Sequence, residues 1–166
     1  QVVVCGRNED KMKSYKRDMD EKGFNVVCNS DINFLSDNCN LIITATAGTE
    51  PLIDAKHIRP GTHITAVGSD TPVKQELSTK LLEKADLIIA DSISQCMVRG
   101  EISHGIRSGL IKKENLAELG DILNKKVHGR LNPNQITIAD LTGVAVQDIQ
   151  IAKAVYQSHK EIINAV

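Results

Sequence analysis

Aromatic side chains are scarce in this chain. They make up 2% of the 166 residues, and there is no tryptophan. Sites that hold bases or sugars by stacking depend on such side chains, so this chemistry is disfavoured. An excess of either charge is also lacking, because 20 Lys and Arg residues face 21 Asp and Glu residues, for a formal net charge of -1. A mainly electrostatic nucleic-acid binder would carry a strong basic excess.

Long apolar runs and clustered cysteines are lacking too. No uninterrupted apolar stretch approaches the roughly 20 residues that a membrane span needs, and no signal-peptide pattern follows Gln1. Cys5, Cys28, Cys39 and Cys96 form no C-x-x-C pair, and the five histidines show no metal-like spacing. We therefore expect no membrane segment, no metal site, and reduced, structurally idle thiols in the cytoplasm.

Short aliphatic runs alternate with amphipathic stretches along the whole chain. Hydrophobic residues make up 41% of the sequence, mostly Ile, Val, Leu and Ala. Strands are expected at residues 2–5, 25–28, 41–45, 62–67, 87–90 and 135–139. Helices are expected at residues 9–22, from 31, at 74–84, 94–108 and 115–124, and from 143 to 164. This alternation predicts an α/β fold with a doubly wound, mainly parallel sheet and helices on both faces.

Two residues mark the limits of the first helix. Asn8 is suited to cap its N-terminus, with acidic residues following in the first turn, and Gly23 is suited to end it. Ligands of open parallel sheets bind at the carboxyl ends of the strands. The loops that could carry chemistry are therefore residues 6–8, 44–49, 68–70 and 91–94.

These loops contain three candidate features, each with a plainer alternative. Arg7 could bind the 2′-phosphate of NADP, or it could be a solvated side chain on an ordinary loop. The small residues of the 44–48 loop would let a ligand approach the backbone, although many loops share this pattern. Asp70 could be an acid/base group or a helix cap. Glu76 is expected to be a surface charge on the 74–84 helix.

Several motifs together resemble the ornithine cyclodeaminase/mu-crystallin family. The resemblance rests on T-A-T-x-x-x-P-[VIL]-[LIF], P-G-[TA]-H-[IV]-x-x-[VI]-G-x-D, G-[ED]-[IV], E-L-G-[ED]-[VI]-[LI] and a C-terminal T-G-V-A-V-Q-D. In this chain they begin at residues 44, 60, 100, 118 and 142, and they cover nearly its whole length in order.

The resemblance implies a Rossmann-like NAD(P)-binding domain over residues 1–142. Residues 143–166 would form a C-terminal helix that returns toward a substrate and dimerisation domain. Family members include cyclodeaminases, amino-acid dehydrogenases and imine reductases, which act as cytoplasmic homodimers on amino acids or cyclic imines. Asp70 matches the family's acid/base candidate. The residues implied to bind cofactor are Arg7, Asn8, Thr44, Ala45, Thr46, Val67, Gly68, Thr142 and Gly143.

Two departures from the family pattern matter. The acidic residue that NAD-using members carry after the second strand is replaced here by Gly6-Arg7-Asn8, so NADP(H) is expected to be preferred, with NAD(H) as the alternative. The G-x-G-x-Q loop, its strand and the substrate domain are not in the sequence. Strands 2–5 and 41–45 should then lack a common neighbour. We expect either a fragment of a longer polypeptide, which we favour, or a rearranged sheet.

The leading hypothesis is the cofactor-binding part of an NAD(P)-dependent cyclodeaminase, dehydrogenase or imine reductase, inactive by itself. The alternatives are a non-catalytic, mu-crystallin-like binder of NADP(H) or a small ligand, and an inactive fragment. The residues that would select a substrate belong largely to the domain that is not in this sequence. The upstream sequence would separate these hypotheses.

Overall fold

The computed structural model describes the backbone of residues 1–164 and the side chains of residues 1–160. The strands are β1 (Val2–Val4), β2 (Val26–Cys28), β3 (Leu41–Thr44), β4 (His63–Ala66), β5 (Leu87–Ala90), β6 (Leu116–Glu118) and β7 (Thr137–Asp140). The α-helices are α1 (Glu9–Asp20), α2 (Ile32–Asn38), α3 (Thr79–Lys84), α4 (Ile93–Cys96), α5 (Gly100–Arg107), α6 (Leu119–Leu123) and α7 (Ala145–Asn164). Short 3-10 helices lie at Ala55–His57 (η1) and Lys113–Asn115 (η2).

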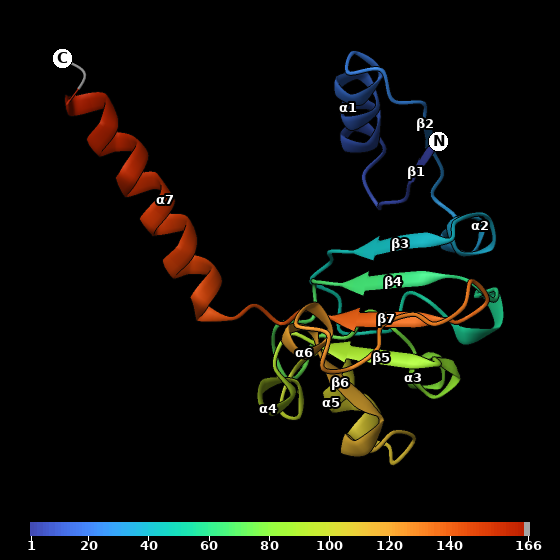
Figure 1. Ribbon diagram of the computed structural model, residues 1–166. Helices are drawn as coiled ribbons and strands as arrows, with labels where there is room; N and C mark the ends of the chain where they lie inside the picture. The colour runs from blue at the N-terminus through green and yellow to red at the C-terminus, as the bar shows by residue number, and fades with distance from the viewer. Residues whose placement is uncertain (165–166) are drawn as a thin grey trace.

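The strands form two parallel sheets. One contains β1 and β2, and the other has the order β3-β4-β7-β5-β6. Each strand pair is parallel, which confirms the predicted sheet type. The last strand, β7, lies between β4 and β5 (Figure 1). At the centre of the larger sheet, β7 therefore pairs with two strands that each end more than 45 residues before it begins.

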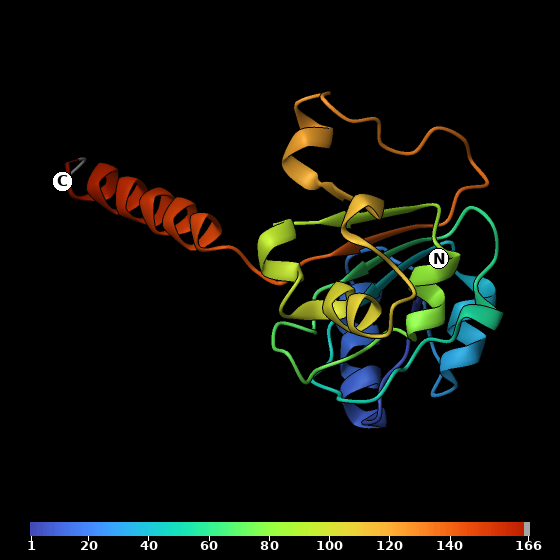
Figure 2. The same cartoon turned by 90° about the horizontal axis from the view of Figure 1, so that it is seen from below.

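The core lies on one face of the larger sheet. Ile42, Ile64, Ile138 and Ile88 occupy one register row across β3, β4, β7 and β5, and each is at most 3% exposed. This row belongs to a cluster that also contains buried residues of α3 and α5. Both helices lie on the same side of the sheet in Figure 2. Alternation along each strand sends every second side chain into this cluster, so the aliphatic runs find their burial here.

The two sheets are separated at the edges of β1 and β3. Neither strand has a partner on the side that faces the other sheet, as Figure 1 shows. Leu41 and Ile43 on β3 are 60% and 66% exposed, whereas the intervening Ile42 is 3% exposed. The expected absence of a common neighbour for these strands is confirmed. The larger sheet is intact and has not rearranged to cover its free edge.

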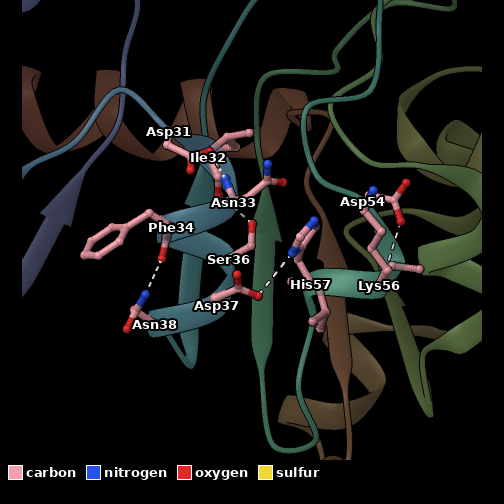
Figure 3. Close-up of polar contacts among 12 residues, drawn as sticks. Asp31, Ile32, Asn33, Phe34, Ser36, Asp37, Asn38, Asp54, Lys56 and His57 are labelled. Atoms are coloured by element: carbon pink, nitrogen blue, oxygen red, sulfur yellow. Dashed lines mark hydrogen bonds and ion pairs between the residues drawn. The ribbon is translucent and has the colours of Figure 1, made fainter.

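Side chains cap the starts of α1, α2 and η1. The side chain of Asn8 accepts a hydrogen bond from the N–H of Lys11 at 2.9 Å, as predicted for the first helix. Asp31 caps α2 and Asp54 caps η1 in the same way. Figure 3 shows that Asp37 of α2 is turned toward His57 of η1, and their Oδ1 and Nδ1 atoms lie 3.2 Å apart. This contact holds the two short helices together beside β3.

Three of the expected helices differ from those in the structure. Residues 74–78 are extended, and α3 begins only at Thr79, because this segment pairs with residues 48–53 instead. The stretch 94–108 is divided between α4 and α5, and 115–124 between β6 and α6. Pairing with β5 draws Leu116–Glu118 into the sheet.

The C-terminal helix α7 extends away from the rest of the molecule (Figures 1 and 2). Each of its residues from 145 to 160 is exposed. Among the described residues, no helix has the length and apolar character needed to span a membrane.

Candidate functional site

The carboxyl ends of the parallel strands meet at one edge of the larger sheet. The loops that follow β3, β4, β5 and β7 begin there, as Figure 1 shows from the direction of the arrows. These are the loops in which the sequence placed most of its candidate residues. Such an edge is where open parallel sheets bind their ligands.

A cleft of about 920 Å³ lies between this edge and the end of β1. Arg7 lines one side of it, and Thr44, Ala45 and Thr46 belong to the stretch that lines the other side. The structure therefore brings together four candidates from two separate sheets. Asn8 caps α1 and lines a smaller depression that it shares with Arg7 and Lys11. The remaining candidates do not line the cleft.

The loop after β3 lies directly on the loop after β4. Gly68 is essential to this contact, because a Cβ atom there would collide with the main chain of Thr46 and come within 2.6 Å of the Glu76 carboxyl carbon. The N–H of Val67 also donates to the Thr44 carbonyl at 2.9 Å. The two loops thus form one continuous surface of small side chains.

Glu76 lies beneath these loops and is fully buried. The Thr44 hydroxyl and the Gly68 N–H donate to its Oε2 at 2.7 and 2.9 Å, and the Thr46 N–H donates to Oε1. The sequence interpretation of Glu76 as a surface charge on a helix is wrong. Its segment is extended, and its side chain turns inward toward donors about 30 residues earlier in the chain.

Asp70 lies two residues beyond Gly68 and carries a half-exposed carboxylate. Lys74 Nζ donates to its Oδ1 at 2.6 Å, and this hydrogen bond lowers the pKa of Asp70 below its usual value. The carboxylate is therefore ionised at neutral pH and can accept a proton. The alternative role as a helix cap is wrong, because no helix begins near Pro72.

Neighbouring side chains hold the loop of residues 70–74 in place. Ser69 Oγ donates to the Lys74 carbonyl at 2.6 Å, and His104 Nε2 lies 2.8 Å from the same oxygen. A carbonyl can only accept, so Nε2 of His104 carries the proton. Arg107 donates to the Pro72 carbonyl at 3.0 Å. These hydrogen bonds restrain the loop that carries Asp70.

Two more carboxylates are buried near this edge of the sheet: Glu101 in α5 and Asp140 at the end of β7. Glu101 accepts the backbone N–H groups of Glu76 and Leu77 at 2.7 and 3.0 Å, and Asp140 Oδ2 accepts that of Ile102 at 2.8 Å. Burial raises the pKa of Glu101 and of Asp140 to about 7 in each case. The sequence assigned no role to either residue, although Glu101 lies in the motif that begins at residue 100, because their burial depends on distant backbone donors.

Thr142 and Gly143 are held by the end of β5. Asp91 Oδ1 accepts from the Thr142 hydroxyl at 3.2 Å, and Oδ2 accepts from the Gly143 N–H at 2.8 Å. The Gln95 amide donates to both residues as well. Gly143 has φ +80°, a conformation that favours glycine. This turn joins the sheet to α7. Within the described residues, no group of three or more His, Cys, Asp or Glu side chains could hold a metal ion.

Comparison with known proteins decides the family. Residues 1–162 match the ornithine cyclodeaminase/mu-crystallin family. The chain belongs to this family. An alanine dehydrogenase of Archaeoglobus fulgidus is 37% identical over 121 residues, which are 72% of this chain and 37% of that protein. An iminosuccinate reductase of Paracoccus denitrificans is 35% identical over 138 residues, which are 82% of this chain and 42% of that protein.

Solved structures of family members share the fold. The Paracoccus denitrificans iminosuccinate reductase in complex with NAD+ superposes with a TM-score of 0.89 at 30% identity, covering 98% of this chain and 50% of that one. A pyrroline-2-carboxylate reductase of Thermococcus litoralis, in complex with NADH and L-proline, gives 0.91 at 26% identity, covering 96% and 50%. The Rossmann-like expectation is therefore confirmed. This ornithine cyclodeaminase/mu-crystallin family chain spans half or less of the length of these relatives.

Proposed function

We propose that this chain is the NAD(P)-binding part of an imine reductase or amino-acid dehydrogenase. The observation that carries the proposal is the loop after β3, whose small residues line a cleft shared with Arg7. The small side chains of this loop leave room for a flat ring, and the Thr46 hydroxyl can form a hydrogen bond with it. Relatives described as NAD+ and NADH complexes support this interpretation.

The residues present fit a nicotinamide cofactor. Thr44, Ala45 and Thr46 would hold it on one wall of the cleft, and Val67 and Gly68 would approach its nicotinamide end. The turn at Thr142 and Gly143, fixed by Asp91, would lie beside that end. When bound, the nicotinamide supplies a site that accepts or gives up a hydride.

Asp70 would act on the substrate nitrogen. Oxidation of an amine carbon to an imine requires that a proton leave the nitrogen, and reduction requires that one return. An ionised carboxylate can accept this proton, and once protonated it can return it. Lys74 keeps the carboxylate ionised at neutral pH when no proton has been transferred.

The proposal is tested in the whole protein. We expect NADH or NADPH to bind, as measured by fluorescence titration, and turnover of cyclic imines, iminosuccinate or basic amino acids. Asp70→Asn should retain cofactor binding and lose about 10²–10⁴-fold in turnover. Unchanged turnover in Asp70→Asn would rule out the catalytic role. Cofactor binding with no turnover in the wild type would favour the ligand-binding alternative.

We further propose that the whole protein binds NADP(H) in preference to NAD(H). Arg7 is exposed at the cleft, and its guanidinium is suited to a 2′-phosphate. Arg7→Ala should weaken NADPH binding by about 1.5–3 kcal/mol and leave NADH binding unchanged. Arg17→Ala is the matched control, since Arg17 is also exposed but lies in the last turn of α1. Equal affinity of the wild type for both cofactors would refute the preference.

The whole protein is proposed to be a cytoplasmic homodimer. Residues 1–142 would form the cofactor domain, and residues 143–166 would lead into a substrate and dimerisation domain. The exposed helix α7, which leaves the sheet at the Gly143 turn, supports this division. An archaeal alanine dehydrogenase described as a dimer supports the assembly. The intact mass and the sedimentation of the whole protein would test both points.

A further inference from the structure

The carboxylate of Glu76 joins two loops that belong to different strands. Its Oε2 receives the Thr44 hydroxyl from the end of β3 and the Gly68 N–H from beyond β4. Its Oε1 receives the N–H of Thr46. One buried side chain thus accepts hydrogen bonds from three residues on two loops. Two of these residues, Thr44 and Thr46, line the cleft.

Hydrogen bonds hold the Glu76 carboxyl group in place. None of the ion pairs found among the described residues includes Glu76. The side chain is 0% exposed, so its lone pairs depend on the two N–H groups and the hydroxyl. Retention of a carboxylate at such a position is costly unless all of these donors are aimed at it.

The segment that carries Glu76 is itself fixed. Its N–H donates to Glu101 at 2.7 Å, and its carbonyl accepts from Leu52 and Ile53 at 2.7 and 3.1 Å. The backbone that carries the carboxylate is therefore fixed by hydrogen bonds from both its N–H and its carbonyl. With Gly68 in contact with the Thr46 main chain, little freedom remains for either loop.

We infer that Glu76 is a positioning residue: it holds Thr44, Thr46 and Gly68 in the arrangement that receives the nicotinamide cofactor. This inference rests on the proposed function. Glu76 makes no contact with the cofactor itself and acts through the two loops. Through Gly68 it also sets the start of the loop that carries Asp70.

Glutamine is a discriminating replacement. Glu76 uses both oxygens as acceptors, whereas a glutamine amide has one acceptor oxygen and one donor NH₂ group. Whichever way the amide is turned, its NH₂ group faces a backbone N–H, either that of Gly68 or that of Thr46. Glu76→Gln therefore detaches one loop while it preserves size.

The experiment compares Glu76→Gln with Leu81→Ala in the whole protein. Leu81 is fully buried in α3, so its truncation lowers stability without removing a hydrogen bond to either loop. We expect Glu76→Gln to raise the dissociation constant for the reduced cofactor about tenfold. It should also shift the NMR signals of the Thr46 and Gly68 amides. Leu81→Ala should lower Tm and change neither.

The possible results separate the inference from the proposed function. Equal cofactor affinity in Glu76→Gln and the wild type would overturn the inference alone. A wild type that binds no nicotinamide cofactor would overturn the proposed function, and the inference with it. If Glu76→Gln does not fold, Thr44→Val serves instead, because it removes one donor to the carboxylate and keeps the side-chain shape. A loss of about threefold in affinity is expected there, and no loss would refute the inference.

Discussion

The β1–α1–β2 unit and the five-stranded unit are built from similar strands but differ in burial. In residues 1–30, the buried hydrophobic residues are Met12 and Val26. In the five-stranded unit, β4, β7 and β5 each have partners on both sides, and a cluster of 15 buried residues covers one face of the sheet.

The contrast shows that neighbours, and not strand composition, decide burial. Val2, Val3 and Val4 are all half-buried, although an all-valine strand is suited to the interior. Leu41 and Ile43 are exposed because they alternate with Ile42 and therefore leave β3 on the face opposite the buried cluster. The smaller unit therefore depends more heavily than the larger one on whatever pairs with its free edge.

The largest expected difference between the units is in hydrogen exchange. Amides of β5 and β7 should exchange only on global unfolding, because these strands lie at the centre of the larger sheet. Amides of β1 should exchange through local opening, faster by more than about a thousandfold. Native-state exchange followed by NMR measures this directly. Equal protection of Val3 and Ile138 would show that the two units unfold together.

Core truncation should affect the units unequally. Leu82 is fully buried between the sheet and its helices, so Leu82→Ala should lower the free energy of unfolding by about 2–5 kcal/mol. Met12→Ala truncates Met12, which is the buried residue of α1 in the smaller unit. It should shift the main unfolding transition by less than about 1 kcal/mol if that unit opens separately. Chemical denaturation of both variants would distinguish these outcomes, and similar shifts would contradict the division.

The pH dependence of stability should originate in the larger unit. The pKa values of Glu101 and Asp140 are about 7 in the folded chain, above those of an unfolded carboxyl group. The folded state therefore binds more protons between about pH 4 and 7, and stability falls as pH rises through this window. Asp140→Asn should reduce this fall by on the order of 1–3 kcal/mol, as measured by thermal unfolding at pH 5 and pH 8. An identical pH dependence in the variant would contradict the assignment.

The smallest effect is expected at the exposed ion pair of Asp70 and Lys74. Lys74→Met should change the free energy of unfolding by at most about 1 kcal/mol, since the pair faces solvent. It should raise the pKa of Asp70 toward its usual value and move the acidic limb of the turnover profile to higher pH. A profile that does not move would show that Asp70 does not titrate in the reaction.

Local sequence was sufficient to predict the cap of the first helix and the aliphatic strands. Asn8 caps the first helix because its side chain reaches an N–H only three residues away. The runs that became β3, β4 and β5 were predicted within about two residues, since continuous aliphatic segments favour buried parallel strands. The separation of β1 from β3 also followed from the sequence, through the strand order of the family resemblance.

Tertiary structure alone decided the short strand β6, the position of β7 and the burial of Glu76. Leu116–Glu118 consists of residues that favour helices and was predicted as part of a helix, and it becomes a strand by pairing with β5. Glu76 has the sequence pattern of a solvated helix residue, yet it is buried because donors about 30 residues earlier converge on its carboxylate. Contacts of this kind depend on how distant segments are brought together, and no local pattern encodes them.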